Sequence, residues 1–323
     1  DYSNYGTIYI TGDDNTISDN SIVNSENTST VYFADATNQV FTNNEIYSTR
    51  GSSVIRTSNS EVLISHNLIE SEVRAIEMNS QSGGEVSNNT IISPNFADYG
   101  IHISNLTMPV VENNIIEGFT NGIYAENDLQ NQFIQNNNLW NISGELFSGT
   151  AMPQLIGQMI DMNNNADTCD IYSNLNMDPL FVNPDSSDYN LQANSPCINA
   201  GHEGSALDPD GTIADMGAFF SFYFGCMDEI AFNYDPLANF DDSSCIAISY
   251  GCMDISAFNY NPQANTDDSS CIYHGCTYHW AVNYDSLATV DDGSCIPPIY
   301  GCTDTSAFNY NPQVNTDDGS CIA

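Results

Sequence analysis

The first 145 residues of this chain repeat with a period close to 23 residues, and this period limits the fold more than any other feature. Each repeat contains the motif Asn-x-(Ile/Leu), with an apolar residue three positions before the asparagine, and a second ladder of isoleucine and valine runs in step with it. The asparagines are Asn20, Asn44, Asn67, Asn89, Asn114 and Asn137, and the second ladder is Ile8, Val31, Val54, Ile76, Ile101 and Ile123. Because the patterns stay in step, the chain predicts a solenoid of stacked turns.

The pattern inside each repeat indicates which solenoid forms. Short β-branched stretches alternate apolar and polar residues, as strands with one buried face do, and Asn and Gly between them allow left-handed turns. A turn of this length suits three short strands and three bends, so the predicted fold is all-β, a right-handed parallel β-helix. Ladder side chains would then stack about 4.8 Å apart, and the asparagine amides would hydrogen-bond along the axis. A leucine-rich repeat is the alternative solenoid, but its leucine pattern is absent.

Four near-copies of a short unit rich in cysteine and aspartate close the chain. In each unit two cysteines stand nineteen positions apart, and an Asn-Tyr-(Asp/Asn) motif and an Asp-Asp-(Ser/Gly)-Ser motif lie between them. The predicted domains are coils over 1–145, a closing segment over 146–222, and units over 223–247, 248–273, 274–297 and 298–323. A unit this short has too little apolar surface to fold alone, so disulfides or bound ions must hold it. We expect its phenylalanine and tyrosine to form a miniature core beside the cysteines.

Ten cysteines, an even number, favour an oxidising and therefore extracellular location. Pairing within each unit is the simplest connectivity and would stabilise it by roughly 3 kcal/mol per bridge, although the short gap from Cys271 to Cys276 leaves pairing between units open. Cys169 and Cys197 are expected to bridge the closing segment. The eight cysteines of the units are Cys226, Cys245, Cys252, Cys271, Cys276, Cys295, Cys302 and Cys321. Zinc is the competing interpretation, but no Cys-x-x-Cys spacing occurs.

The charge is extreme, with 42 acidic residues against three arginines and a net charge of −39. Nucleic acid and direct insertion into an anionic membrane are therefore not expected, since both favour basic surfaces. In the four units the acids and amides recur at fixed offsets, which predicts Ca²⁺ sites built from oxygen ligands. The predicted ligands are Asp228, Asp235, Asp241, Asp242, Asp254, Asn261, Asp267, Asp268, Asp285, Asp291, Asp292, Asp304, Asn311, Asp317 and Asp318. The alternative is that these side chains accept backbone N–H groups in turns.

Two resemblances narrow the expectations. The Asn-Asn-x-Ile turns, such as 43–46 and 113–116, and the segments 178–184 and 195–201 resemble secreted parallel β-helix proteins of the pectate-lyase-like superfamily over residues 1–222. Ala214 stands where that family often has arginine, so a salt bridge to Asp215 is in doubt. Residues 224–323 resemble Gly-Cys-Thr-Asp…Asp-Asp-Gly-Ser-Cys repeats of large secreted bacterial surface proteins, which implies an extracellular, calcium-associated module without a catalytic role.

The sequence favours a structural protein over an enzyme. Polysaccharide lyases and hydrolases use β-helix scaffolds, but a lyase acting on acidic sugars needs basic residues, and this chain has few. A hydrolase needs two spaced carboxylates, and the candidates Glu70, Glu72, Asp98 and Glu112 are not distinctive among so many acids. His66 replaces a turn asparagine and is expected to be structural.

We therefore expect a cell-surface filament subunit or adhesin stalk that self-associates head to tail, because the ladder begins at Ile8 without a capping helix before it. A module that binds surface glycans along one face of the β-helix is the alternative, and exposed aromatic residues on one flank would favour it.

Overall fold

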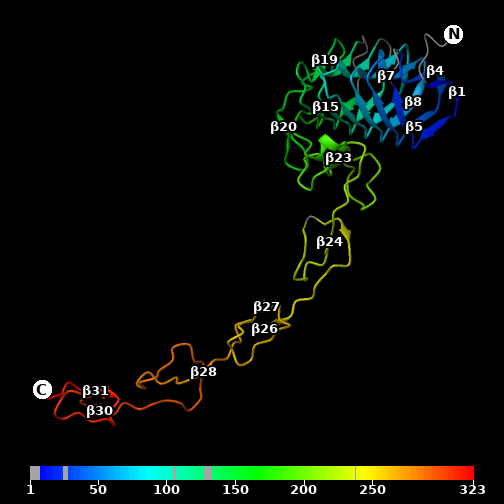
Figure 1. Cartoon of the computed structure of the whole chain (residues 1–323). Helices are drawn as coiled ribbons and strands as arrows, with labels where there is room; N and C mark the ends of the chain where they lie inside the picture. The colour runs from blue at the N-terminus through cyan, green and yellow to red at the C-terminus, as the bar shows by residue number, and fades with distance from the viewer. Residues whose placement is uncertain (1–7, 25–27, 105–106, 127–132, 237) are drawn as a thin grey trace. The chain divides into compact units, whose positions relative to one another are not determined.

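The computed structural model describes residues 8–24, 28–104, 107–126, 133–236 and 238–323 (Figure 1). The chain forms two compact units, one ending at Tyr223 and the other running from Phe224 to Ala323.

The first unit is a right-handed parallel β-helix in which each coil contributes one strand to each of three sheets, as the sequence predicts (Figure 1). Sheet A contains β1 (Ile8–Asp13), β4 (Val31–Thr37), β7 (Ser53–Ser58), β10 (Arg74–Asn79), β13 (Tyr99–Ile103), β16 (Asn121–Ala125) and β19 (Phe147–Ser148). Sheet B contains β2 (Thr16–Ser18), β5 (Gln39–Thr42), β8 (Glu61–Ser65), β11 (Gly83–Ser87), β14 (Val110–Glu112) and β17 (Phe133–Gln135). Sheet C contains β3 (Ser21–Asn24), β6 (Glu45–Ser48), β9 (Leu68–Ser71), β12 (Thr90–Ile92), β15 (Ile115–Glu117) and β18 (Asn138–Trp140).

The aliphatic ladder of sheet A forms the core with one change of register. Val31 pairs with Ile55, and Ile55 pairs with Ile76, so the predicted member Val54 is wrong. Val54 is fully buried as well, which explains why the sequence does not separate the two neighbours. Burying each such side chain stabilises the coil by roughly 1.5–3 kcal/mol.

The asparagine ladder forms as predicted and runs between sheets B and C. Each ladder amide donates to the next ladder oxygen, for example from Asn67 Nδ2 to Asn89 Oδ1 at 2.9 Å and from Asn89 Nδ2 to Asn114 Oδ1 at 2.9 Å. The same oxygen also accepts the backbone N–H of the preceding ladder residue, at 3.1 Å for Asn67. Asn174 ends the ladder by accepting from Asn137 at 3.1 Å.

The residue before each ladder asparagine has a left-handed backbone conformation, and Asn and Asp adopt this conformation more readily than most residues. These residues are Asp19, Asn43, His66, Asn88, Asn113 and Asn136, with φ between 50° and 60°. His66 therefore stands at a turn position where the other coils have Asn or Asp, as the sequence predicts.

The closing segment contains β20 (Asp161–Met162), β21 (Thr168–Cys169), β22 (Phe181–Asn183), a 3-10 turn (Pro184–Ser186) and β23 (Asp188–Leu191). It packs on sheet C and forms a second core, in which Leu68, Ile92 and Ile115 of the coils meet residues of the segment. Those residues include Leu175, Phe181, Tyr189, Leu191, Cys197 and Met216. In place of a salt bridge, the Asp215 carboxylate accepts the backbone N–H groups of Asn199 and Ser221.

The expected bridge between Cys169 and Cys197 is wrong, because both are buried free thiols. Both cysteines belong to the second apolar core, but they have different neighbouring residues. Cys197 Sγ accepts a hydrogen bond from Asn138 Nδ2 at 3.1 Å, whereas Cys169 lies in the hairpin of β20 and β21 opposite Asp161. Burial raises the pKa of the Cys197 thiol to about 12, and both cysteines pack in the second apolar core.

The second unit holds the four repeats, and each repeat has one short parallel strand pair and one internal disulfide. The pairs are β24 (Phe224–Gly225) with β25 (Phe240–Asp241), β26 (Tyr250–Gly251) with β27 (Thr266–Asp267), β28 (His274–Gly275) with β29 (Val290–Asp291), and β30 (Tyr300–Gly301) with β31 (Thr316–Asp317). The disulfides are Cys226–Cys245, Cys252–Cys271, Cys276–Cys295 and Cys302–Cys321, which confirms pairing within each repeat.

The expected miniature cores of phenylalanine and tyrosine are wrong, because the tyrosines Tyr234, Tyr260, Tyr284 and Tyr310 are 38–40% exposed and the phenylalanines are more exposed still. Phe232, Phe258 and Phe308 are 54%, 78% and 91% exposed, and Val282 at the same position is 51% exposed. The neighbouring asparagine holds each repeat together instead. For example, Asn259 Nδ2 donates to the Ser270 carbonyl at 2.7 Å, and its Oδ1 accepts the Ile272 N–H at 2.7 Å.

Candidate functional site

A row of aromatic and charged side chains follows the outer face of sheet A. The register places Tyr9, Tyr32, Arg56, Glu77, His102 and Tyr124 side by side on successive coils. Their neighbours along each strand, such as Val31 and Phe33, are buried in the core, so these side chains point away from it. We call these six residues, together with Arg74 and Tyr99, the outer row.

Ring contacts join the members of the outer row. The Tyr9 and Tyr32 centroids are 5.4 Å apart, the His102 ring stacks on Tyr124 at 5.0 Å and 30°, and Tyr99 stacks on His102 at 5.4 Å and 25°. These distances suit attractive aromatic pairs. The rings therefore contact one another in groups and are partly exposed.

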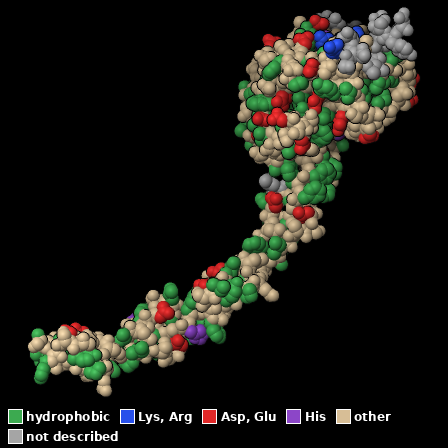
Figure 2. Space-filling model, in the orientation of Figure 1, with side chains coloured by type: hydrophobic (Ala, Val, Ile, Leu, Met, Phe, Trp, Pro, Cys, Tyr) green, Lys and Arg blue, Asp and Glu red, His purple; other side chains and the backbone are tan. Residues whose placement is uncertain are grey.

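Two of the three arginines of the chain belong to the outer row. Arg56 Cζ lies 5.3 Å from the Tyr32 centroid, and Arg74 Cζ lies 5.2 Å from that of Tyr99. Arg74 also forms ion pairs with Glu77 at 3.2 Å and Asp98 at 3.4 Å. In Figure 2 the blue side chains gather in one small region of the β-helix. The row therefore combines rings with hydrogen-bond donors on a molecule that is otherwise strongly acidic.

The imidazole of His102 is neutral at pH 7. Burial, and secondly the charge of Arg74, lower the pKa of His102 below its ordinary value. A neutral ring can offer its face for stacking without adding a charge to the row.

The predicted calcium ligands lie in exposed turns. One side-chain oxygen of most of them accepts the backbone N–H two residues further along, as Asp242 does from Ser244 at 2.9 Å and Asp268 from Ser270 at 3.0 Å. The same contact forms for Asp228, Asp241, Asp254, Asn261, Asp267, Asp285, Asp291, Asp292, Asp304, Asn311, Asp317 and Asp318. Hydrogen bonds from the side chains of Ser244, Ser270, Ser294 and Ser320, and secondly from their backbone N–H groups, lower the pKa of Asp242, Asp268, Asp292 and Asp318.

These residues therefore have the geometry of the alternative to calcium binding, in which the side chains accept backbone N–H groups in turns. Asp235 lies against Gly225, with its Oδ2 3.2 Å from where a β-carbon on that glycine would stand. Within the described ranges, no three residues of the types His, Cys, Asp and Glu are grouped closely enough to hold a metal ion. Calcium binding stays a prediction.

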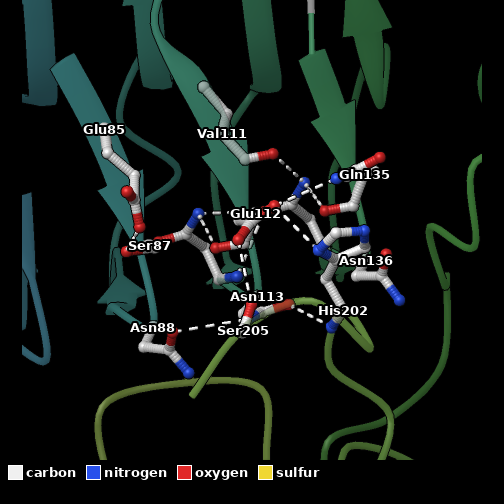
Figure 3. A network of polar contacts seen from close by, with 12 residues as sticks. Glu85, Ser87, Asn88, Val111, Glu112, Asn113, Gln135, Asn136, His202 and Ser205 are labelled. Carbon is white, nitrogen blue, oxygen red and sulfur yellow. Dashed lines mark hydrogen bonds and ion pairs between the residues drawn. The ribbon is translucent and has the colours of Figure 1, made fainter. Parts of the chain in front are cut away.

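Glu112 stands at the centre of a polar network that the sequence does not reveal (Figure 3). Its Oε1 accepts from the Ser205 hydroxyl at 2.9 Å, its Oε2 accepts from Gln135 Nε2 at 3.0 Å, and His202 Nδ1 lies 3.6 Å from Oε2. Asn113 adds a bond from its Nδ2 to Ser205 Oγ at 3.0 Å. Because His202 and Ser205 come from the closing segment, this network fastens that segment to the coils.

The other three acids that the sequence singles out do not gather around Glu112. Asp98 pairs with Arg74, and Glu70 lines a groove of about 620 Å³ between sheet C and the closing segment. The backbone N–H of Glu72 donates to the Ser48 carbonyl in the turn after β9.

Comparison with protein families assigns the fold. The family described as the right-handed beta helix region matches residues 6–175, more than half of the chain. The chain belongs to this family. Comparison with curated proteins and with solved structures found no match.

The family assignment covers the coils and leaves the four repeats outside it. Its members share a fold, so the assignment by itself does not select an activity. In the part of the chain that the structure describes, no helix has the length and apolar character needed to cross a membrane. The β-helix together with four disulfides fits an extracellular protein.

Proposed function

We propose that the protein is an extracellular adhesion protein whose β-helix binds a neutral glycan chain along the outer row of sheet A. The observation that carries the proposal is the alignment of stacked rings and guanidinium groups on successive coils. Sugar rings have apolar faces that can lie on aromatic rings, and their hydroxyl groups can accept from arginine. A solenoid offers such contacts at a regular spacing of about 4.8 Å, which suits a polymer with repeated units.

The charge of the molecule supports a neutral ligand. A net charge of −39 repels acidic polysaccharides over distances up to the Debye length. Arg74 is already paired with Glu77 and Asp98, so the row does not carry a large free positive charge.

The test is a glycan array probed with the wild-type chain and with the double variant Tyr32→Ser/Tyr124→Ser. A stacked ring contributes about 0.5–1.5 kcal/mol, so removing two rings is expected to weaken binding about tenfold or more. Tyr47→Ser is the matched control, because Tyr47 is an exposed tyrosine on the outer face of sheet C. Equal binding by the double variant and the control would contradict the proposal.

A second candidate function is self-association into a filament or adhesin stalk. Among the described strands, β1, β2 and β3 each lie at the end of their sheet, and a strand at the end of a sheet can pair with a strand of another chain. Tyr9 and Val23 on these strands are 46% and 70% exposed. Sedimentation velocity over a hundredfold range of concentration tests this function, since head-to-tail association gives larger species as the concentration rises. A single monomeric species throughout would end it.

We also propose that Ca²⁺ stabilises the four repeats. The support is the recurrence of acids at fixed offsets in a chain of large negative charge. Calcium binding would require the carboxylates to exchange some turn hydrogen bonds for the ion. Isothermal titration of the chelator-treated chain with Ca²⁺ is expected to release or absorb heat, and a thermal scan with Ca²⁺ is expected to show a higher melting temperature than a scan without it. The absence of both effects would refute this role.

The proposed role is binding without catalysis. In its support, both oxygens of the Glu112 carboxylate are engaged by Ser205 and Gln135, which is the arrangement of a structural clamp. Reducing-sugar assays on a panel of neutral and acidic polysaccharides are expected to show no turnover, and measurable turnover would overturn this part of the proposal.

A further inference from the structure

At two surface positions the third repeat has aromatic side chains where the second and fourth repeats have an acid and a serine. In the second repeat the Asp254 carboxylate accepts from the Ser256 N–H at 2.8 Å and from its hydroxyl at 2.7 Å, and in the fourth repeat Asp304 and Ser306 make the same contacts. The third repeat has Tyr278 and Trp280 at these two positions. An acid and a hydroxyl have therefore been replaced by two aromatic side chains.

The two rings contact each other where the acid and the hydroxyl do in the second and fourth repeats. The Tyr278 and Trp280 centroids are 5.5 Å apart, and their planes meet at 24°, so the rings are nearly parallel. Beside them, the His279 ring lies 4.4 Å from that of Tyr284. The third repeat thus carries a stacked pair of aromatic rings at this turn.

The turn from Tyr278 to Ala281 has the same backbone hydrogen bond as the corresponding turn of the second repeat, which has no aromatic pair. The Ala281 N–H donates to the Tyr278 carbonyl at 3.0 Å, and the Ala257 N–H donates to the Asp254 carbonyl at the same distance. The disulfide Cys276–Cys295 also encloses the same separation as in the other repeats. The third repeat therefore keeps this turn bond and the disulfide of the same separation, while its surface differs.

The aromatic pair is exposed to water. Tyr278 is 49% exposed and Trp280 is 57% exposed. Exposing a large ring forgoes the free energy that burial of its apolar surface would give. A contiguous exposed apolar surface on a repeat that folds equally well without it points to a ligand.

We propose that the Tyr278–Trp280 pair of the third repeat binds a neutral pyranose saccharide by stacking. The C–H groups on the flat face of a pyranose carry a small positive charge, and they match the negative face of an indole or phenol ring. An acidic sugar is disfavoured by the surrounding carboxylates. This site lies in the second unit and is independent of the outer row, which lies in the first.

The experiment uses tryptophan fluorescence of the full chain. The sequence has only two tryptophans, Trp140 and Trp280, so in a Trp140→Phe background the emission reports Trp280 alone. We would titrate this chain with neutral hexasaccharides of glucose, mannose and N-acetylglucosamine. We expect a saturable change in emission with at least one of the three, and no saturable change with any of them overturns the proposal.

The variant Tyr278→Asp/Trp280→Ser is matched to the fold, because it gives the third repeat the residues of the second and fourth. It lacks the reporter tryptophan, so its binding is measured by isothermal titration with the same saccharide. We expect at least tenfold weaker binding at this site, with Cys276–Cys295 still formed in a disulfide map. Unchanged affinity and stoichiometry would overturn the proposal.

The reciprocal variant Asp304→Tyr/Ser306→Trp moves the aromatic pair into the fourth repeat. It is expected to add one binding site for the same saccharide, and an unchanged stoichiometry would show that the pair does not make a site. The outer-row variant Tyr32→Ser/Tyr124→Ser, prepared in the Trp140→Phe background, is expected to keep the Trp280 signal. Failure of glycan binding at sheet A can thus be distinguished from failure at the third repeat.

Discussion

Single asparagine side chains fix the coils of the β-helix. Asn89 is fully buried, accepts from the N–H and amide of Asn67, and donates to Asn114 and to the carbonyls of Ile64 and Ser87. No other side chain of that size offers both a donor and an acceptor in the same plane. The stability of each turn therefore depends on one amide.

Replacing Asn89 with Ala should destabilise the β-helix by about 2–4 kcal/mol, because it leaves a buried N–H and buried carbonyls without partners. The measurement is urea unfolding followed by far-ultraviolet circular dichroism. Asn20→Ala is the matched control, since Asn20 is the exposed end of the same ladder. Its expected cost is under about 1 kcal/mol, and equal losses in the two variants would contradict this role of the ladder.

Asp208 should make the folded state less stable as the pH rises. Burial, and secondly the charge of Asp215, raise the pKa of Asp208 from 3.8 to about 7. An acid whose pKa is raised by folding binds more protons in the folded state than in the unfolded state, so the free energy of unfolding falls between about pH 4 and 7.

The variant Asp208→Asn should remove this dependence and stabilise the chain at pH 8. Its side-chain oxygen can still accept the Asp215 N–H, a bond of 2.8 Å in the native chain. Because the carboxyl is partly exposed, we expect a gain on the order of 1 kcal/mol. Melting temperatures measured at pH 5 and pH 8 check this prediction. Between these two pH values, the melting temperature of the wild type must fall more than that of the variant. Asp188→Asn, at an exposed hairpin, is the control.

At the scale of elements, the sequence predicts the parts of the molecule that repeat. The spacing of Asn44, Asn67 and Asn89 predicts one coil per repeat, and the nineteen-residue spacing predicts each disulfide. The outer row could not be predicted, because which residues are neighbours depends on a register that Val54 and Ile55 leave ambiguous. The Glu112 network brings together residues about 90 positions apart, and no local pattern encodes such a contact.

Each repeat should depend on its own disulfide. The double variant Cys252→Ser/Cys271→Ser is expected to lose roughly 3 kcal/mol and to unfold the second repeat while the β-helix melts at its usual temperature. Hydrogen exchange followed by mass spectrometry locates the loss. Met253→Ser, an exposed neighbour of Cys252, is the control. Increased exchange in the coils as well would contradict independent repeats.

At the scale of the whole molecule, negative charge and exposed aromatic rings occur together. The net charge of −39 is expected to disfavour acidic polymers, while the outer row and the Tyr278–Trp280 pair have partly exposed aromatic rings. The stapled repeats and the stacked coils have separate cores, so each can carry its own contact surface. These features suit a protein that works outside the cell and holds neutral glycans.

The most direct measurement is a crystal structure of the wild-type chain soaked with the neutral oligosaccharide that gives the strongest array signal. The account predicts sugar rings lying over Tyr32, Tyr99 and Tyr124, with hydroxyl groups within hydrogen-bond distance of Arg56 or Arg74. Sugar bound elsewhere on the β-helix, with the outer row left empty, would contradict it.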